Sequence, residues 1–204
     1  MTHVVLASAS PRRKELLAAL LTEFDVVPSK VDESPVPEDP VQGAVALAVQ
    51  KARAVAGRHP DAVVIGADTV VHDGTRDYSK PHDAADAIAT LKALRGRDHR
   101  VVTGVAVILN GEERTATSIA TVRLCTLGDE AIAHYVASGR PLDKAGAYAI
   151  QDEDVPTVER LDGCYCSVMG LPLWTLRGLL RDAGVDSHDP GRSISRCACC
   201  PDRP

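Results

Sequence analysis

Alternating apolar and polar segments predict a chain of short strands and amphipathic helices. Continuous apolar runs are typical of strands, and they occur at residues 4–7, 24–28, 61–71 and 101–109. Apolar residues that recur with a helical period occur at residues 11–21, 41–56, 88–94, 129–138 and 171–180. Because the run at 61–71 is almost uninterrupted, we expect it to be a central strand covered on both faces.

Turn signals predict that the sheet is partly antiparallel. Asn110-Gly111 lies between two apolar runs and favours a type I′ hairpin that pairs them. Asp162-Gly163 predicts a second hairpin, whose returning strand spans residues 164–169. No internal repeat or clean linker divides the 204 residues, so the sequence predicts one α/β domain with a mixed sheet and flanking helices.

Composition narrows the class of protein without fixing a function. Apolar residues make up 45% of the chain and aromatic residues only 3%, so we expect a core of Ala, Val, Leu and Ile. The net charge of −5 argues against a nucleic-acid partner, because non-specific binding to nucleic acid depends on a positive field. No apolar run approaches the roughly 18 residues of a membrane span. We therefore expect a cytoplasmic protein with reduced thiols and no membrane partner.

Five of the six cysteines fall into two groups, and Cys125 stands apart from both. Cys164 and Cys166 alternate along a predicted strand and are interpreted as small core or surface residues. The second group consists of Cys197, Cys199 and Cys200. This group lies in residues 185–204, a polar segment that we predict to be a disordered tail following a domain of residues 1–184. A soft-metal clip is conceivable in the tail, but no further His or Cys stands at zinc-site spacing.

The first strand-to-helix turn carries an unusual group of cations. Ser10 is placed to be the N-cap, and Pro11 suits the first helical position. Arg12, Arg13 and Lys14 follow directly, although a helix N-terminus favours negative charge. Three cations beside free backbone N–H groups predict a bound anion, most simply a phosphate. The alternative is a surface helix whose basic side chains bend into water.

Two charged residues interrupt segments that otherwise predict a buried core. Lys51 shares a helical row with apolar residues, so either its stem lies on the core with its head in water or its ammonium has a function. Asp68 interrupts the central strand, and a buried carboxylate needs a cation, a metal or a raised pKa. The alternative for Asp68 is that it satisfies backbone groups at a bend.

Together the candidate residues indicate phosphoryl or nucleotidyl hydrolysis. The cations that suit a polyphosphate are Arg12, Arg13, Lys51 and Lys80. Glu33, which follows a strand end, and Asp68 suit one divalent cation, Mg²⁺ or Mn²⁺, because both metals prefer oxygen ligands. A carboxylate can also accept a proton from an attacking water. The sequence has no Walker A motif, no Gly-x-Gly-x-x-Gly motif and no Ser nucleophile elbow.

At this point the sequence resembles the Maf family of nucleoside triphosphate pyrophosphatases. The matching blocks, in order, are residues 8–13, 51–53, 66–71, 80–81, 141–151 and 170–173. The resemblance implies an α/β fold of two lobes around a deep cleft, related to the inosine triphosphate pyrophosphatases. It also implies metal-dependent hydrolysis of a nucleoside triphosphate to the monophosphate and pyrophosphate, as house-cleaning of non-standard nucleotides.

The resemblance also implies roles for individual residues. Asp68 matches the family's proton acceptor and possible metal ligand, and Glu33 matches a metal-site acid. The residues that match the family's phosphate-binding positions are Ser8, Ser10, Arg12, Arg13, Lys51 and Lys80. The residues at positions that separate the branches of the family are Arg12, Thr69 and Gln151. These three resemble the dTTP/UTP branch rather than the branch that acts on 7-methyl-GTP, and a Gln amide can pair with a pyrimidine edge.

Some positions depart from the family pattern. Residues 152–154 are acidic where the family tends to have small, glycine-containing sequence, and Ser79 replaces a common glycine. The acidic run favours an alternative reading, a nucleotide-binding regulator of cell division with little turnover. A third hypothesis is that the protein binds partners through its cysteine tail. We expect a nucleoside triphosphate as the partner, and a homodimer is possible.

Overall fold

A single six-stranded mixed sheet organises the molecule, in the order β2-β1-β3-β4-β5-β6. The computed structural model describes residues 2–32, 37–152 and 155–204. The strands are β1 (Val4–Leu6), β2 (Asp25–Val26), β3 (Val63–His72), β4 (Asp98–Leu109), β5 (Glu112–Leu124) and β6 (Val158–Asp162). β1 runs parallel to β2 and β3, and the remaining neighbours are antiparallel. The predicted mixed sheet is confirmed.

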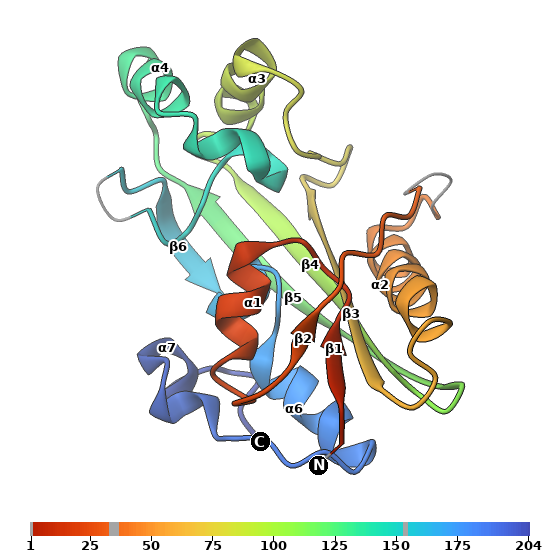
Figure 1. Ribbon diagram of the computed structural model, residues 1–204. Coiled ribbons are helices and arrows are strands. Elements are labelled where there is room, and N and C mark those ends of the chain that lie inside the picture. The colour runs from red at the N-terminus through yellow and green to blue at the C-terminus, as the bar shows by residue number, and fades with distance from the viewer. Residues whose placement is uncertain (1, 33–36, 153–154) are drawn as a thin grey trace.

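The tight turn between β4 and β5 follows the sequence signal. Asn110 and Gly111 both have positive φ, +52° and +80°, as a type I′ turn requires. β4 and β5 then pair in register along their whole length, from Leu109 opposite Glu112 to Asp98 opposite Arg123. This long hairpin, with β3 beside it, spans the molecule from one end to the other (Figure 1).

Helices cover both faces of this sheet. The α-helices are α1 (Pro11–Leu17), α2 (Pro40–Ala56), α3 (Ala84–Leu94), α4 (Asp129–Ala137), α5 (Tyr165–Val168), α6 (Leu173–Asp182) and α7 (Ser195–Ala198). Three 3₁₀ turns are η1 (Arg140–Asp143), η2 (Ala145–Ala147) and η3 (Pro190–Arg192). α2 packs with Val5 and Val64, whereas α1 and α6 pack with Leu6 and Ile65. Because neighbouring strand residues point to opposite faces, α2 covers one face, and α1 and α6 cover the other.

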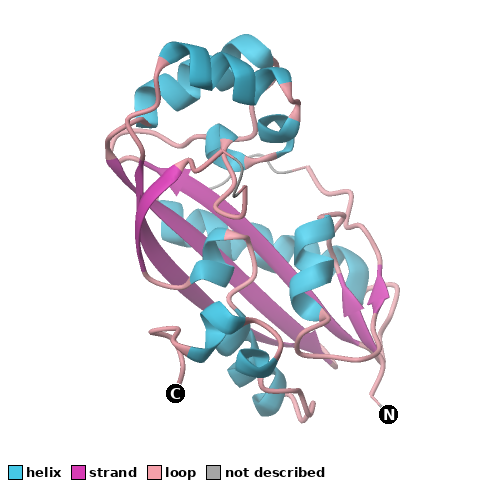
Figure 2. Ribbon diagram, turned by 90° about the vertical axis from the view of Figure 1, so that its left-hand side faces the viewer, coloured by secondary structure: helices cyan, strands magenta, loops and turns pink. Residues whose placement is uncertain are grey.

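The core divides into two lobes, as expected. The large lobe contains α1, α2, α5, α6 and α7 on β1 and on the halves of β3–β5 beside it. The small lobe contains α3, α4, η1 and η2, which pack on Val71, Val101 and Val122 at the other end of the same strands. Figure 2 shows this group of helices gathered beyond one end of the long strands. β3 passes through both lobes, so residues near its middle lie where the lobes meet.

The predicted strand at residues 164–169 is wrong, because this segment forms α5. Gly170 has φ +108°, and its N–H donates to Ser167 O (2.9 Å), while Leu171 N–H donates to Cys166 O (2.9 Å). These bonds close the helix end in the Schellman pattern, a stop that glycine provides without strain. β6 pairs with β5 instead of forming a hairpin with the following residues.

The predicted disorder of residues 185–204 is also wrong. The segment contains η3 and α7, and it buries Val185, Cys197 and Cys200 against the large lobe. The indole N–H of Trp174 donates to the carbonyl of Cys197 at 2.9 Å and fixes the segment on α6. Its contacts are tertiary, and for that reason no helical or strand period revealed them.

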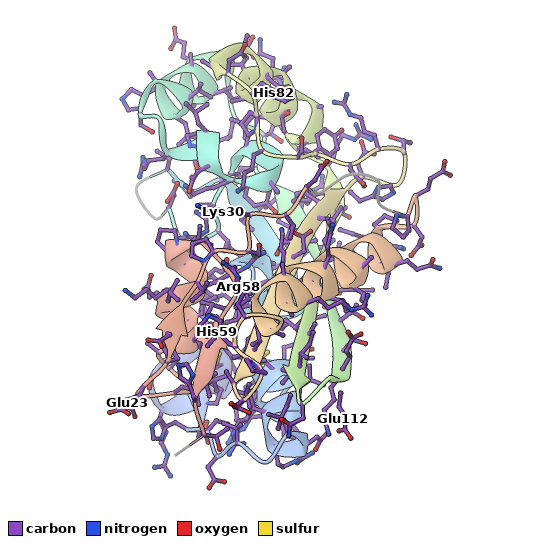
Figure 3. All side chains as sticks on the ribbon, turned by 45° about the vertical axis from the view of Figure 1, so that its right-hand side comes forward. Glu23, Lys30, Arg58, His59, His82 and Glu112 are labelled. Carbon is purple, nitrogen blue, oxygen red and sulfur yellow. The ribbon has the colours of Figure 1, made fainter. Side chains whose placement is uncertain are left out.

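Charged side chains occupy the outer surface. Glu23, Arg58 and Glu112 are exposed and project from three different elements or loops (Figure 3). Among the residues that the structure describes, no helix combines the length and apolarity that crossing a membrane would require.

Candidate active site

The turn from β1 into α1 has the predicted cap. Ser10 Oγ accepts a hydrogen bond from the backbone N–H of Arg13 at 3.4 Å, and Pro11 is the first helical residue. Ser8 is buried, and its Oγ accepts from the N–H of Ser10 at 3.2 Å. Both serines therefore hold backbone groups of this turn and fix the direction in which α1 begins.

Arg13 is held inside the protein by three segments. Its Nε donates to Gly170 O at 2.8 Å, its Nη2 to Thr69 Oγ1 at 3.2 Å and its Nη1 to Ser8 Oγ at 3.4 Å. A Cβ at Gly170 would lie 3.3 Å from Arg13 Nε, so the glycine leaves room for the guanidinium. The alternative that this side chain bends into water is excluded for Arg13.

Lys51 and Asp68 form a buried ion pair. Lys51 Nζ lies 2.6 Å from Asp68 Oδ1, and each residue is only 8% exposed. The lysine therefore does not extend its head into bulk water, and the aspartate is satisfied by a cation rather than by backbone at a bend. Breaking such a pair leaves an uncompensated buried charge, which is why both partners are needed together.

Two glycines bring α2 close enough to make this pair. A Cβ at Gly66 on β3 would lie 2.1 Å from the carbonyl oxygen of Ala48, and a Cβ at Gly104 on β4 would lie 2.5 Å from that of Ala44. Any side chain at these positions would push α2 off the sheet. The absence of a Cβ at both positions lets α2 lie on the strands and present Lys51 to Asp68.

The Arg13–Thr69 set of contacts and the Lys51–Asp68 pair meet on adjacent residues of β3. Asp68 points toward α2, and Thr69 points to the opposite face, toward Arg13. β1 pairs with β3 only as far as Ile65, and between there and Val71 no described strand pairs with β3 on that side. Asp68 and Thr69 therefore lie next to an open strand edge, into which the β1–α1 turn leads.

The structure brings only part of the predicted set together. Arg12 Nη1 lies 3.0 Å from Asp143 Oδ2, which joins α1 to η1 beside this edge. Lys80 is exposed and Gln151 is half-buried, and no hydrogen bond among the described residues connects either of them to the two sets. Glu33 lies outside the described residues.

Two further charged contacts shape the small-lobe side of the site. Lys144 Nζ lies 2.6 Å from Asp143 Oδ1. Burial raises the pKa of the Asp143 carboxyl, but Lys144 and Arg12 together lower it below its ordinary value. Asp152 Oδ2 accepts from Tyr135 OH at 2.6 Å, so the first residue of the acidic run is turned toward α4.

Sequence reasoning missed the roles of two residues, one that supports Thr69 and one that supports Arg13. Thr103 is fully buried, its Oγ1 lies 3.0 Å from Thr69 Oγ1, and it donates to Ser167 O at 2.7 Å. Gly170 accepts the Arg13 bond described above. A polar residue inside the apolar run at 101–109 was the available signal for Thr103, the same signal that singled out Asp68.

A hard divalent cation fits the described donors at one position. Asp68 offers a carboxylate whose Oδ1 is bonded to Lys51, and oxygen is the ligand atom that Mg²⁺ and Mn²⁺ prefer. Mg²⁺ is commonly held by one or two carboxylates together with substrate phosphates, so a single protein carboxylate is compatible with such a site.

Two surface hollows lie away from these residues. One, of about 830 Å³, is lined by residues of β1, α1 and β2 such as His3, Lys14 and Asp25. The other, of about 550 Å³, includes His72, His99 and the start of α2. Neither contains Lys51, Asp68 or Arg13, so the convergence of buried charges rather than the size of a hollow identifies the candidate site.

Comparison with known proteins identifies the family of this chain. The family described as Maf-like protein matches residues 3–183. A protein of Thermomicrobium roseum described as dTTP/UTP pyrophosphatase is 46% identical over 204 aligned residues, covering 97% of this chain and 93% of that protein. Proteins of the same description from Aquifex aeolicus and Moorella thermoacetica are 45% and 47% identical, covering 90% and 91% of this chain and 96% and 97% of their own.

Among solved structures, the Staphylococcus aureus Ham1 protein is similar at a TM-score of 0.46 and 16% identity, over 61% of this chain and 73% of that one. That likeness is too weak to add to the sequence matches. The match over residues 3–183 and the three relatives at 45–47% identity confirm the resemblance, and the chain belongs to the Maf-like protein family.

Proposed function

We propose that this protein hydrolyses nucleoside triphosphates, with dTTP and UTP as its substrates, to the nucleoside monophosphate and pyrophosphate. The relatives described as dTTP/UTP pyrophosphatases support the substrate class. The observation that carries the proposal is the buried Lys51–Asp68 pair at an open strand edge, next to the Arg13–Thr69 set.

The cations suit the charge of the substrate. A triphosphate carries several negative charges, and guanidinium and ammonium groups form short, strong hydrogen bonds with phosphate oxygens. Arg13 is already oriented by three acceptors, so it loses little freedom when an anion approaches. In this proposal Lys51 exchanges part of its contact with Asp68 for a phosphate oxygen, and Lys80 and the Ser8–Ser10 turn contact the remaining phosphates.

Asp68 is the proton acceptor in this proposal. When Lys51 turns toward a phosphate, Oδ1 of the Asp68 carboxylate is released from it and can accept a hydrogen bond from a water molecule. It takes a proton from a water molecule, whose oxygen bonds to the α-phosphorus as the bond from that phosphorus to the bridging oxygen breaks. Pyrophosphate leaves with that bridging oxygen, and the nucleoside monophosphate carries the oxygen of the water.

Mg²⁺ or Mn²⁺ completes the proposal. Asp68 and Glu33 are the residues that would hold it, and the ion supplies charge neutralisation to the triphosphate. Arg12, Thr69 and Gln151 are proposed to set the preference for a pyrimidine base. The amide of Gln151 offers both a donor and an acceptor to the base edge.

A product assay tests the proposal. The chain is incubated with dTTP, UTP, ATP or GTP, with Mg²⁺, with Mn²⁺ and with chelator. We expect pyrophosphate as the first product, faster release from dTTP and UTP than from the purine nucleotides, and loss of activity in chelator. Orthophosphate as the first product, or equal rates in chelator, would contradict the proposal.

The regulator alternative rested on the acidic run after Gln151. The Asp152 carboxylate accepts a hydrogen bond from Tyr135 OH at 2.6 Å, so the first residue of that run is directed toward α4. Tight binding of dTTP without pyrophosphate release under every metal condition would favour the regulator over the enzyme.

A further inference from the structure

Four of the six cysteines meet where the C-terminal segment packs on α5. Cys166 Sγ lies 3.2 Å from Cys197 Sγ, and Cys164 and Cys200 lie beside them on the same two segments. All four residues are at most 8% exposed. Their spacing is Cys-x-Cys on one segment and Cys-x-x-Cys on the other. Thiols from distant parts of the sequence thus share one buried corner, the thiol cluster.

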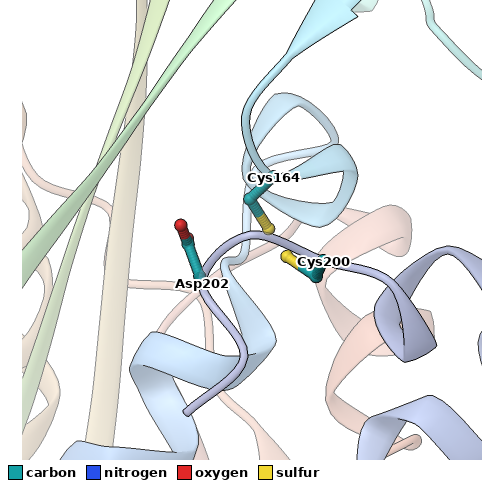
Figure 4. A group of neighbouring side chains, drawn as sticks. All are labelled: Cys164, Cys200 and Asp202. Atoms are coloured by element: carbon teal, nitrogen blue, oxygen red, sulfur yellow. The ribbon is translucent and has the colours of Figure 1, made fainter.

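Part of this cluster has the dimensions of a metal site. The Sγ atoms of Cys164 and Cys200 and a carboxylate oxygen of Asp202 all lie within 4.8 Å of one another. Figure 4 shows the two sulfur atoms facing each other, with Asp202 beside them on the same segment as Cys200. Tetrahedral Zn²⁺ with Zn–S of about 2.3 Å separates neighbouring sulfur ligands by roughly 3.8 Å. Small side-chain rotations would bring these atoms to that spacing.

The surrounding residues hold the ligands in place. Ser118 Oγ donates to Asp202 Oδ2 at 2.7 Å, an arrangement that commonly orients a ligating carboxylate. Ser167 Oγ donates to Cys164 O at 2.7 Å, and Trp174 Nε1 donates to Cys197 O at 2.9 Å. The first bond orients the carboxylate, and the other two fix the backbone of residues that carry thiols.

We propose that the thiol cluster binds one Zn²⁺ or a similarly soft divalent cation. Cys164, Cys200 and Asp202 provide three ligands. One sulfur of the Cys166–Cys197 pair, which lies outside this group of three, would have to move toward it to provide the fourth. Sulfur ligands select zinc over the hard cations of the phosphate site. Each coordinating thiol releases a proton to solvent, and no atom changes oxidation state. The inference is independent of the proposed hydrolysis.

The competing chemistry is a disulfide between Cys166 and Cys197. It would use only two of the four thiols and would not explain why Cys164, Cys200 and Asp202 lie together. It would also need an oxidant, whereas all the cysteines in the structure are free thiols.

A metal site here would fasten the C-terminal segment to α5. α5 ends at Gly170, whose carbonyl accepts from Arg13 at 2.8 Å, and Ser167 O accepts from Thr103 at 2.7 Å. Binding of a cation would therefore stiffen backbone that also positions the phosphate side of the molecule. We expect Zn²⁺ to raise the midpoint of thermal unfolding.

Metal analysis of the full chain tests the site. The protein is produced with Zn²⁺ in the medium, purified anaerobically, and measured for metal content and free thiols. We expect about one Zn²⁺ per chain, and Co²⁺ in its place should give the visible absorption of a tetrahedral thiolate site. Cys164→Ser and Cys200→Ser should lower occupancy at low free Zn²⁺ by about tenfold or more.

Cys199 provides the matched control. It is exposed on the same short segment, so Cys199→Ser should keep full occupancy. Asp202→Asn should weaken Zn²⁺ affinity by about 10- to 100-fold, and it serves if a cysteine variant does not fold. The proposal is overturned if the wild-type chain binds no Zn²⁺, if Cys199→Ser loses the metal as fully as Cys200→Ser, or if peptide mapping of the anaerobic protein finds Cys166 linked to Cys197.

Discussion

The small lobe and the large lobe bury polar side chains of different kinds. In the small lobe, three tyrosine hydroxyls contact titratable groups: Tyr78 bonds to Asp73, Tyr135 to Asp152 and Tyr148 to His99. In the large lobe, the buried polar groups beyond the phosphate-side contacts include four thiols and, beside them, the hydroxyls of Ser118 and Ser167. The two lobes share one sheet, yet a change of pH should act mainly on the first and a change of metal or redox state mainly on the second.

The region between the lobes differs from both. There the buried groups are full charges, Lys51 on α2 and Asp68 on β3, and β3 is a strand that belongs to both cores. Charges buried in this way contribute little net stability compared with well-packed apolar residues. Their presence at the junction therefore indicates function, whereas the tyrosine and thiol groups on either side stabilise the lobes in which they lie.

The junction is tested most strongly by Asp68→Asn. The amide keeps the shape and still accepts from Lys51, but it cannot take a proton. We expect kcat, measured by pyrophosphate release, to fall by about 10²- to 10⁴-fold. The thermal midpoint should also fall, because the buried Lys51 ammonium loses its counter-charge, while circular dichroism should still show a folded chain at the assay temperature. Asp129→Asn, at an exposed carboxylate on α4, should keep full activity. Retention of more than a tenth of kcat by Asp68→Asn would remove Asp68 from the mechanism.

The acid sensitivity of the small lobe is tested through His99. Burial lowers the pKa of His99 to about 4, from an ordinary value of 6.5. Between these values the unfolded chain binds a proton that the folded chain does not, so stability is full above pH 6.5 and falls as the pH drops toward 4. The loss over this interval is about 3 kcal/mol by linkage.

His99→Gln keeps a hydrogen-bonding group for Tyr148 OH and removes the titration. We expect urea unfolding of this variant to lose less free energy between pH 7 and pH 4.5 than the wild type does. His134→Gln, at an exposed position of α4, is the control and should behave like the wild type. The same acid loss in both variants would show that other groups control the small lobe.

The close packing of α2 against the sheet in the large lobe is tested by adding one methyl group. Gly66→Ala places a Cβ 2.1 Å from Ala48 O, so backbone must shift. We expect the free energy of unfolding to fall by about 1–3 kcal/mol and activity to fall as Lys51 moves. Gly178→Ala, inside α6 with open space around it, should instead stabilise by up to about 1 kcal/mol. Equal changes in the free energy of unfolding for the two variants, measured in urea, would contradict the close packing of α2 against the sheet.

The smallest effect is expected where an ion pair joins the lobes. Arg12 and Asp143 lie 3.0 Å apart with side chains 23% and 60% exposed, so solvent screens their attraction. Arg12→Ala should lower the free energy of unfolding by no more than about 1 kcal/mol. A double-mutant cycle with Asp143→Ala measures the coupling, and a larger value would mean that this pair, rather than the shared sheet, holds the lobes together.

Much of the fold could be predicted because its signals are local. The Ser10 cap, the Asn110-Gly111 turn and the helical period of α2 each depend on neighbours within a few residues. The short helix α5 was mistaken for a strand because a run of five or six residues is compatible with both. Gly170, its stop signal, was identified only as part of a family block.

The candidate site could be predicted in part. Asp68 and Lys51 were singled out because each interrupts an apolar pattern, and the structure pairs them. Thr103 and the carbonyl of Gly170 were missed because their role is to orient another residue. Lys80 and Gln151 remain predictions, since no described hydrogen bond connects them to the site.

By itself, the sequence determined the elements, the central strand and the family, because these depend on periodicity and on short motifs. The tertiary structure decided which distant residues meet: Arg13 with Gly170, Lys51 with Asp68, and the C-terminal thiols with α5. The physical reason is that hydrophobic periodicity specifies which face of an element is buried, but not which polar groups will lie opposite one another. Those contacts depend on how closely α2 and the C-terminal segment pack on the sheet. Glycines and buried side chains that lie far apart in the chain determine this packing.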